Sequence, residues 1–193
     1  MSQAPTIVIL GGPNGAGKST CAAILIPDSV PFINADDIAK TLPNFPSPAA
    51  DVEAGRILLR RMDECAAQNA DFAVETTLSS RALAPRIKRL QAAGYRFSLG
   101  YVWTPDVELS IARVAERVRS GGHNIPEDVI RRRYKMGLKN FFELYRPIAD
   151  EWTIYMNTTY RKPLRIAAGI RTESIEIYSQ TVWEDILREN EHE

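Results

Sequence analysis

Residues 12–19 constrain the fold of this chain more than any other segment. They read Gly-Pro-Asn-Gly-Ala-Gly-Lys-Ser and fit the pattern G-x-x-x-x-G-K-S/T. The apolar run 6–10 comes directly before them, and residues 18–25 continue in a helical pattern. A buried strand, a glycine-rich turn and a helix in this order predict a P-loop, whose backbone N–H groups converge on phosphate oxygens.

The residue types of this loop suit the binding of a nucleoside triphosphate. Glycines let successive N–H groups turn inward without Cβ clashes, and the helix that follows points its positive N-terminus at the same anion. We expect Lys18 to reach the β- and γ-phosphates, Ser19 to bind Mg²⁺ and Thr20 to contact the α-phosphate. The predicted nucleotide-binding set in this loop is Gly12, Asn14, Gly15, Ala16, Gly17, Lys18, Ser19 and Thr20.

Short apolar runs alternate with longer helical patterns along most of the chain, which predicts a three-layer α/β P-loop domain resembling the nucleotide kinases, with a mostly parallel sheet. The four further strands of a five-stranded sheet are expected at 31–34, 72–75, 95–103 and 152–156. The helices are expected at 18–25, 51–68, 80–93, 106–119 and 126–145, with a proline-rich loop at 41–50. We treat 1–193 as a single domain with a C-terminal extension at about 158–193, formed by a small β-hairpin and a helix at 181–190.

Composition limits the partners of the chain. Its 193 residues include 24 Lys and Arg and 24 Asp and Glu, so the formal net charge is zero. No overall field attracts nucleic acid or an anionic membrane, and no run reaches the roughly 18 apolar residues that span a bilayer. Two cysteines do not make a disulfide framework, and the first residues lack the pattern of a secretory signal. We therefore expect a cytoplasmic protein without membrane or nucleic-acid partners.

Acidic residues follow two of the predicted strands, and an arginine-rich segment lies further along the chain. Asp36 follows the second strand and Glu75 ends the third, so both are expected at the carboxyl edge of the sheet, where ligands bind. Residues 113–134 are rich in arginine and are interrupted by Gly121-Gly122, as in a lid that closes over phosphates. The guanine-specific pattern N-K-x-D is absent. These features favour an ATP-dependent small-molecule kinase.

Three alternatives remain open at this point. One is a kinase for a metabolite or an antibiotic, and another is a polynucleotide kinase that uses the basic segment. The third is an ABC-like ATPase switch that acts on a protein partner, because Ser-Gly-Gly-His at 120–123 is similar to part of the LSGGQ signature. In that case Asp150-Glu151 would have to serve as the acidic pair that follows an apolar strand.

Several motifs, taken with the P-loop, resemble the zeta-toxin family, in particular its short bacterial branch, which is often labelled as ABC-type ATPases. They are Phe-Ile-Asn-Ala-Asp-Asp at 32–37, Ala-Val-Glu-Thr-Thr at 73–77, Gly-His-Asn-Ile-Pro at 122–126 and Arg-Arg-Arg-Tyr at 131–134. The resemblance covers about residues 5–157. It implies a P-loop kinase that phosphorylates the 3′-hydroxyl of the amino sugar in UDP-N-acetylglucosamine with Mg²⁺-ATP, and an antitoxin as protein partner.

The resemblance also assigns roles to single residues. Asp36 matches the catalytic Asp beside the acceptor hydroxyl, and Glu75 and Thr77 match substrate-site residues. Arg81 replaces an Arg that the larger toxins carry nearer to that Glu, and the lid arginines fall within 113–133. The further expected roles are Lys18, Arg117 and Arg132 in catalysis, Arg133 on the nucleotide, His123 on the substrate, and Glu75 on Mg²⁺ through water.

Each of these assignments has a structural alternative. Asp36 would instead cap a helix that begins at Asp37, and Thr77 would cap the helix that follows it. Glu75 would form an ion pair with Arg81, because a charge at the end of a buried strand needs a partner. The lid arginines would form a solvated basic face paired with Glu116 or Glu127.

Overall fold

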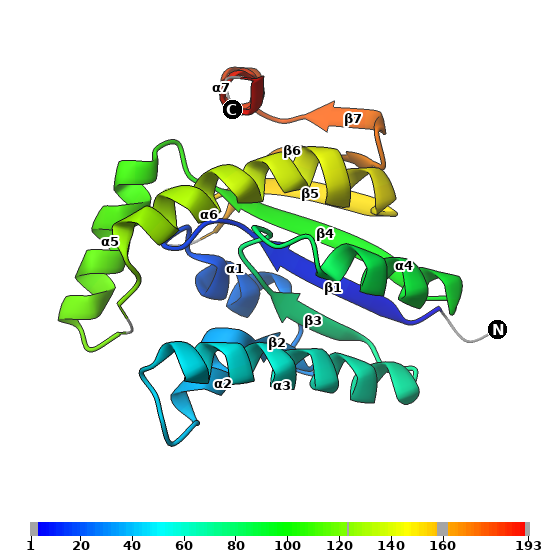
Figure 1. Cartoon of the computed structure of the whole chain (residues 1–193). Coiled ribbons are helices and arrows are strands. Elements are labelled where there is room, and N and C mark those ends of the chain that lie inside the picture. Colours follow the sequence, from blue (N-terminus) through cyan, green and yellow to red (C-terminus); the bar gives the residue numbers. More distant parts are fainter. Residues whose placement is uncertain (1–3, 123, 158–161, 192–193) are drawn as a thin grey trace.

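The computed structural model describes residues 4–122, 124–157 and 162–191. A seven-stranded sheet with the order β2-β3-β1-β4-β5-β6-β7 forms its centre (Figure 1). The strands are β1 (Thr6–Gly11), β2 (Phe32–Asn34), β3 (Phe72–Glu75), β4 (Arg96–Trp103), β5 (Glu151–Met156), β6 (Leu164–Ile170) and β7 (Glu173–Ile177).

Helices connect the strands, and three of them begin with a side-chain cap. The Asn34 side chain accepts a hydrogen bond at the start of α2, Ser47 does so for α3, and Asp106 for α5. The helices are α1 (Lys18–Leu25), α2 (Ala35–Lys40), α3 (Pro48–Ala67), α4 (Leu83–Ala92), α5 (Val107–Arg119), α6 (Glu127–Asn140), the π-helical turn η1 (Phe141–Tyr145), the 3-10 turn η2 (Arg146–Ile148) and α7 (Gln180–Glu191).

The sheet has two more strands than the sequence predicts. The five strands from β1 to β5 are parallel, as expected, but the C-terminal hairpin joins the same sheet, since β6 pairs antiparallel with β5 and β7 with β6. This pairing satisfies the free N–H and C=O groups along the edge of β5. It also buries Ile166 and Ala167 in the main core. The hairpin formed by β6 and β7 therefore belongs to the central sheet instead of forming a separate appendage.

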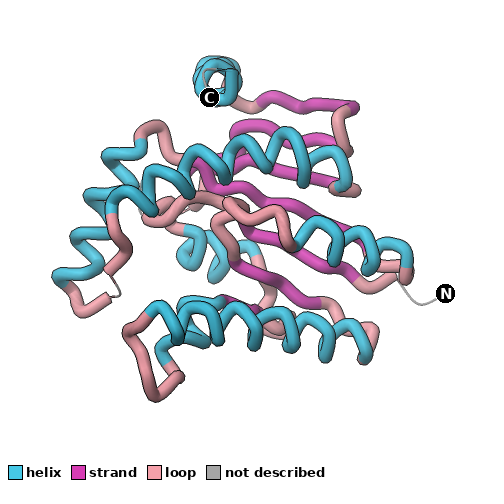
Figure 2. The backbone as a smooth tube through the Cα atoms, viewed as in Figure 1, coloured by secondary structure: helices cyan, strands magenta, loops and turns pink. Residues whose placement is uncertain are grey.

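The two faces of the sheet are covered unequally. Side chains such as Ile9, Phe97 and Trp152 point to the face covered by α3, α4, α6 and α7, where most of the core lies. Alternate residues such as Leu10 and Val102 point to the other face, where they pack with Cys21 of α1 in a smaller cluster. Figures 1 and 2 show α3, α4 and α6 in front of the sheet and α1 behind it.

Helix α5 and the start of α6 form a third, separate apolar cluster. Val114 of α5 packs with Ile125 and Ile130, and Ile111, Val118 and Val129 lie around them. This part of the chain lies beyond the carboxyl ends of the parallel strands, next to the loop after β1 (Figure 1). The arginine-rich segment predicted as a lid is therefore a two-helix unit with its own small core.

The C-terminal helix α7 is anchored to the same domain. Trp183 is buried and stacks on Trp152 with a centroid distance of 6.1 Å. The indole N–H of Trp103 donates to Glu189 Oε2 over 2.8 Å. In the part of the chain that the structure describes, no helix combines the length and apolar character that crossing a membrane requires.

Candidate active site

The carboxyl ends of three neighbouring strands bring the predicted site together. The order β2-β3-β1 places the ends of these strands side by side. Glu75 lies in register with Asn34 on one side and with Leu10 on the other. Since Leu10 leads into the P-loop and Asn34 leads into α2, the predicted phosphate loop and Asp36 meet around Glu75. Parallel pairing thus joins segments that are far apart in the sequence.

The P-loop adopts the conformation that its glycines allow. Gly17 is the N-cap of α1 and has a φ of 85°, in the left-handed region. A Cβ at this position would lie 2.1 Å from Nδ2 of Asn157, which follows β5. Any side chain here would therefore both strain the backbone and displace Asn157. The loop is specified by its own glycines and by the end of a distant strand.

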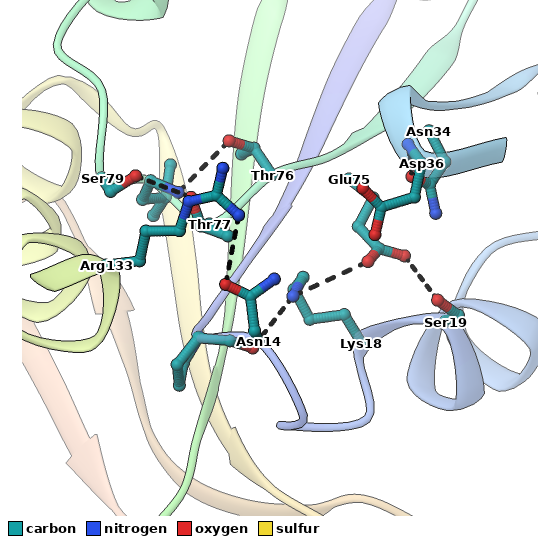
Figure 3. Close-up of polar contacts among 12 residues, drawn as sticks. Asn14, Lys18, Ser19, Asn34, Asp36, Glu75, Thr76, Thr77, Ser79 and Arg133 are labelled. Carbon is teal, nitrogen blue, oxygen red and sulfur yellow. Dashed lines mark hydrogen bonds and ion pairs between the residues drawn. The ribbon is translucent and has the colours of Figure 1, made fainter. Parts of the chain in front are cut away.

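Lys18, Ser19 and Glu75 form one polar group at the start of α1 (Figure 3). Lys18 Nζ donates to Pro13 O over 3.0 Å and lies 3.7 Å from Glu75 Oε1. Ser19 Oγ donates to the other carboxylate oxygen of Glu75 over 2.8 Å. Burial lowers the pKa of Lys18, and the negative charges of Glu75 and Asp36 oppose that shift. The ion-pair partner of Glu75 is therefore Lys18, and not Arg81.

Asp36 is free to meet a ligand. Its backbone N–H donates to Asn34 Oδ1 over 2.9 Å, so Asn34 caps α2 and the alternative that Asp36 is the cap is wrong. The Asp36 side chain is exposed and lines three adjoining cavities. Asp37, the next residue, pairs with Lys40 over 2.7 Å. Figure 3 shows Asp36 beside Glu75 and Asn34.

The first of these cavities, the phosphate cleft, has a volume of about 390 Å³ and lies over the P-loop. It contains most of the predicted nucleotide-binding and catalytic residues. Those that line it are Asn14, Gly15, Gly17, Lys18, Ser19, Thr20, Asp36, Glu75 and Arg117. Gly12 and Ala16 are buried within the loop itself. Arg113 also lines the cleft and donates to Gly15 O and Asn157 O over 3.4 and 3.2 Å.

The second cavity, the α3 cavity, has a volume of about 420 Å³. Its lining includes the polar residues Asp36, Glu75 and Thr77 and apolar residues of α3 such as Leu58 and Leu59. Thr77 Oγ1 shares a hydrogen bond of 2.8 Å with Ser79 Oγ. Helix α4 begins without a side-chain cap, so the alternative that Thr77 caps it is wrong.

The arginines predicted to form the lid contact different parts of the structure. Arg133 Nη1 lies 3.4 Å from Asn14 Oδ1, across the mouth of the P-loop (Figure 3). Arg132 lines a third cavity and not the phosphate cleft. Arg119 pairs with Glu116 and Arg131 with Glu108, so these two follow the alternative of an exposed, paired face.

Arg81, one of the predicted substrate residues, is not brought to the site. Arg81 is exposed in the bend before α4 and lines none of the three cavities around Asp36. It lies near the buried hydroxyl of Tyr145, whose pKa burial raises to about 12. His123, predicted to contact the substrate, lies outside the described residues.

Some residues of the site were not predicted from the sequence. Asn34 could have been found from the sequence, because an Asn with acidic residues two and three positions later is typical of a helix start. Gly137 had none. A Cβ there would lie 2.6 Å from the Thr77 carbonyl, so this glycine lets α6 pack against the segment after β3 and sets where Arg133 lies.

Comparisons with known proteins bear on the family and the fold of the chain. The model of the family described as "Zeta toxin" matches residues 1–180. An uncharacterized protein of Haemophilus influenzae is 34% identical over 123 residues, which are 64% of this chain and 88% of that protein.

Two solved structures share the fold. A chain of the AvrRxo1-ORF1:-ORF2 complex with ATP is 18% identical, with a TM-score of 0.72, over 94% of this chain. This chain spans only 63% of that one. A chain of the PezAT chromosomal toxin–antitoxin system of Streptococcus pneumoniae is 19% identical, with a TM-score of 0.69, over 99% of this chain and 86% of that chain.

Proposed function

The chain belongs to the zeta toxin family, and from that premise we propose that it transfers the γ-phosphoryl group of Mg²⁺-ATP to a hydroxyl of a small acceptor. We propose UDP-N-acetylglucosamine as that acceptor. The observation that carries the proposal is the phosphate cleft, in which a P-loop lysine and the exposed carboxylate of Asp36 line one cavity. A donor phosphate on the loop and a hydroxyl beside Asp36 would meet there.

The P-loop residues suit the role of a phosphate donor site. Lys18 is buried but keeps its ammonium within reach of the cleft, where a phosphate would replace Pro13 O and Glu75 as its partner. Bound Mg²⁺ neutralises phosphate charge and aligns the transferring group. Ser19 and Glu75 are the residues that would hold it, since their oxygens already lie 2.8 Å apart. Oxygen ligands of this kind are those that Mg²⁺ prefers.

Asp36 is proposed as the catalytic residue on the acceptor side. Its carboxylate accepts the hydrogen bond of the acceptor hydroxyl and takes the proton as the oxygen attacks phosphorus. Asn34 fixes the backbone of Asp36 at the first turn of α2, which leaves only side-chain rotation to be restricted on binding. Thr77 in the α3 cavity would position the acceptor without taking part in proton transfer.

Arginines of the lid supply positive charge around the transferring group. Arg117 lines the phosphate cleft from α5, and Arg133 reaches the P-loop from α6. Fixed cations aimed at the developing charge are the main contribution of a protein to phosphoryl transfer. We propose that α5 and the start of α6, which share a small apolar core, move together as the lid, with the turn at Gly121 between the two helices. Gly121 has a φ of 86°, which a glycine adopts without strain.

The position of the acidic pair at 150–151 supports a kinase over an ABC-like ATPase. Asp150 Oδ2 accepts from the backbone N–H of Phe97 at the start of β4, and Glu151 is the first residue of β5. Both therefore lie at the amino ends of the parallel strands, opposite the P-loop. An acidic residue there is too far from the phosphate cleft to act on a nucleotide.

A protein partner is part of the proposal. One of the similar structures is described as a toxin–antitoxin system, and another as a complex of two gene products. We propose that this chain likewise has an antitoxin that controls its activity. Coexpression with the neighbouring gene product, followed by size-exclusion chromatography, tests this directly. Loss of ATP turnover in the complex is the expected result.

The test of the kinase proposal is ADP release from Mg²⁺-ATP with and without UDP-N-acetylglucosamine, with the nucleotide sugar analysed by mass. A gain of one phosphoryl group on the sugar is the expected result. An unmodified sugar with ATP still bound would refute this acceptor, and a panel of other hydroxyl compounds would follow. Acceptor-independent hydrolysis together with nucleotide-dependent dimerisation would refute the kinase itself.

A further inference from the structure

Three consecutive arginines of α6 face three different surroundings. Arg131 pairs with Glu108 of α5, away from the P-loop. Arg133 lies against Asn14 of the P-loop. Arg132, between them, is exposed and points to neither partner. Because successive residues of an α-helix are turned by about 100°, adjacent side chains necessarily project in different directions.

Arg132 lines a separate cavity of about 310 Å³, here called the Arg132 cavity. Its apolar walls are Ile125, Pro126 and Val129, from the connection between α5 and α6 and the first turn of α6. Arg133 forms a second basic wall and is shared with the α3 cavity. Asp36 is shared with the phosphate cleft. A molecule whose hydroxyl sits beside Asp36 can therefore extend into this cavity without entering the donor site.

The charges of the Arg132 cavity suit an anionic group. A planar guanidinium binds phosphate in a bidentate manner, and apolar walls strengthen the attraction by excluding water. Two carboxylates also line the cavity. Asp36 is committed to the acceptor hydroxyl, and Asp51 lies in the first turn of α3, where the helix dipole offsets its charge. Arg132 remains to meet the ligand, since Arg133 also contacts Asn14 of the P-loop.

We infer that the Arg132 cavity is an anion subsite for the acceptor, and that Arg132 is a specificity-determining residue that selects hydroxyl compounds carrying a phosphate or diphosphate group. This inference rests on the proposed function and deepens it. It assigns Arg132 to the acceptor and not to the transferring phosphoryl group, which Arg117 faces from the phosphate cleft. Separate cavities would also keep the negative groups of donor and acceptor apart, which reduces their repulsion.

The kinetic test compares Arg132→Gln with Arg131→Gln, a matched control on the same helix whose partner Glu108 lies outside the site. With UDP-N-acetylglucosamine as acceptor, Arg132→Gln is expected to raise the acceptor KM roughly tenfold, the effect of one lost charge-assisted hydrogen bond. The KM for ATP and the kcat at saturating acceptor should stay within about twofold. A lower kcat with an unchanged acceptor KM would overturn the inference, because it would place Arg132 on the transferring group.

A binding test separates this inference from the proposed function. Lys18→Ala weakens phosphate binding at the P-loop, so calorimetric titration of this variant with UDP reports mainly the acceptor side. Adding Arg132→Gln is expected to weaken UDP binding about tenfold and leave uridine binding unchanged, whereas adding Arg131→Gln changes neither. Equal UDP affinity with and without Arg132, or no UDP binding at all, would overturn the inference. If binding behaves as expected but the wild-type protein phosphorylates nothing, only the proposed function fails.

Discussion

The donor and acceptor sides of the site are built in different ways. The donor side is one continuous segment, residues 12–20, whose shape is fixed by glycines with positive φ and by a buried lysine. The acceptor side is assembled from four segments that are distant in the sequence, at 34–36, 51–59, 75–83 and 124–133. Local backbone chemistry therefore specifies the nucleotide site, while helix packing specifies the acceptor site. A change of acceptor needs only changes in the packing around Asp36.

The largest effect is expected from Lys18→Ala, which changes the donor side of the site. Loss of the ammonium removes charge-assisted hydrogen bonds to the phosphates, and ATP affinity should fall by roughly 100-fold, with turnover lost in parallel. Calorimetric titration with Mg²⁺-ATP measures the effect. Lys139→Ala, which removes a lysine of α6 that pairs with Glu143 of η1, is the control and should bind ATP normally. Full ATP affinity in Lys18→Ala would refute the P-loop assignment.

The next largest effect is expected from Asp36→Asn, which changes the acceptor side of the site. The amide keeps the size of the side chain but cannot take a proton, so kcat should fall by about 10² to 10⁴. ATP affinity should change by less than about twofold. Asp63→Asn is the matched control, because Asp63 pairs with Arg86 and lines none of the three cavities around Asp36. A collapse of ATP binding in Asp36→Asn would instead make Asp36 a structural residue or a metal ligand.

A smaller effect is expected from Asn14→Ala, which removes a contact between the two sides. The single hydrogen bond from Arg133 to Asn14 is 3.4 Å long, and its loss should lower kcat between about twofold and tenfold. ATP affinity should fall to a similar extent, because Asn14 also lines the phosphate cleft, and thermal stability should be little changed. Glu108→Gln breaks the pair of the neighbouring Arg131 and should leave kcat unchanged. If both variants lose activity equally, the effect comes from general loosening of α6.

The last prediction concerns stability and not activity, and it is made for the thiol below the donor side. Burial raises the pKa of Cys21 from 9.0 to about 11. Because the folded pKa lies above the unfolded one, the stability contributed by this thiol is fully present below pH 9 and is lost as the pH rises through about 11. The free energy of unfolding of wild type relative to Cys21→Ala should therefore fall by about 2 to 3 kcal/mol across this window. Urea denaturation at several pH values measures it, and a constant difference would contradict the burial of the thiol.

Much of the fold and of the donor side could be predicted from the sequence. The apolar runs, the P-loop glycines and the alternation of strands and helices each depend on neighbouring residues, and the five parallel strands are found where they were expected. Asp36 and Glu75 could be placed because the carboxyl ends of parallel strands share one edge. The side chains that contact these two residues could not be predicted. Glu75 binds Lys18 and Ser19, and Asn34 takes the capping role that was considered for Asp36.

The sequence by itself determined where phosphate binds, because a P-loop is a local arrangement of N–H groups, glycines and one lysine. Only the tertiary structure decided how the acceptor side is arranged. Nothing in the run Arg131–Arg133 indicates that one side chain faces α5, the next a separate cavity and the third the P-loop. Those directions depend on where α6 lies, and Gly137 sets that position through its close approach to the Thr77 carbonyl. The acceptor side is a product of packing between distant segments, which no local pattern records.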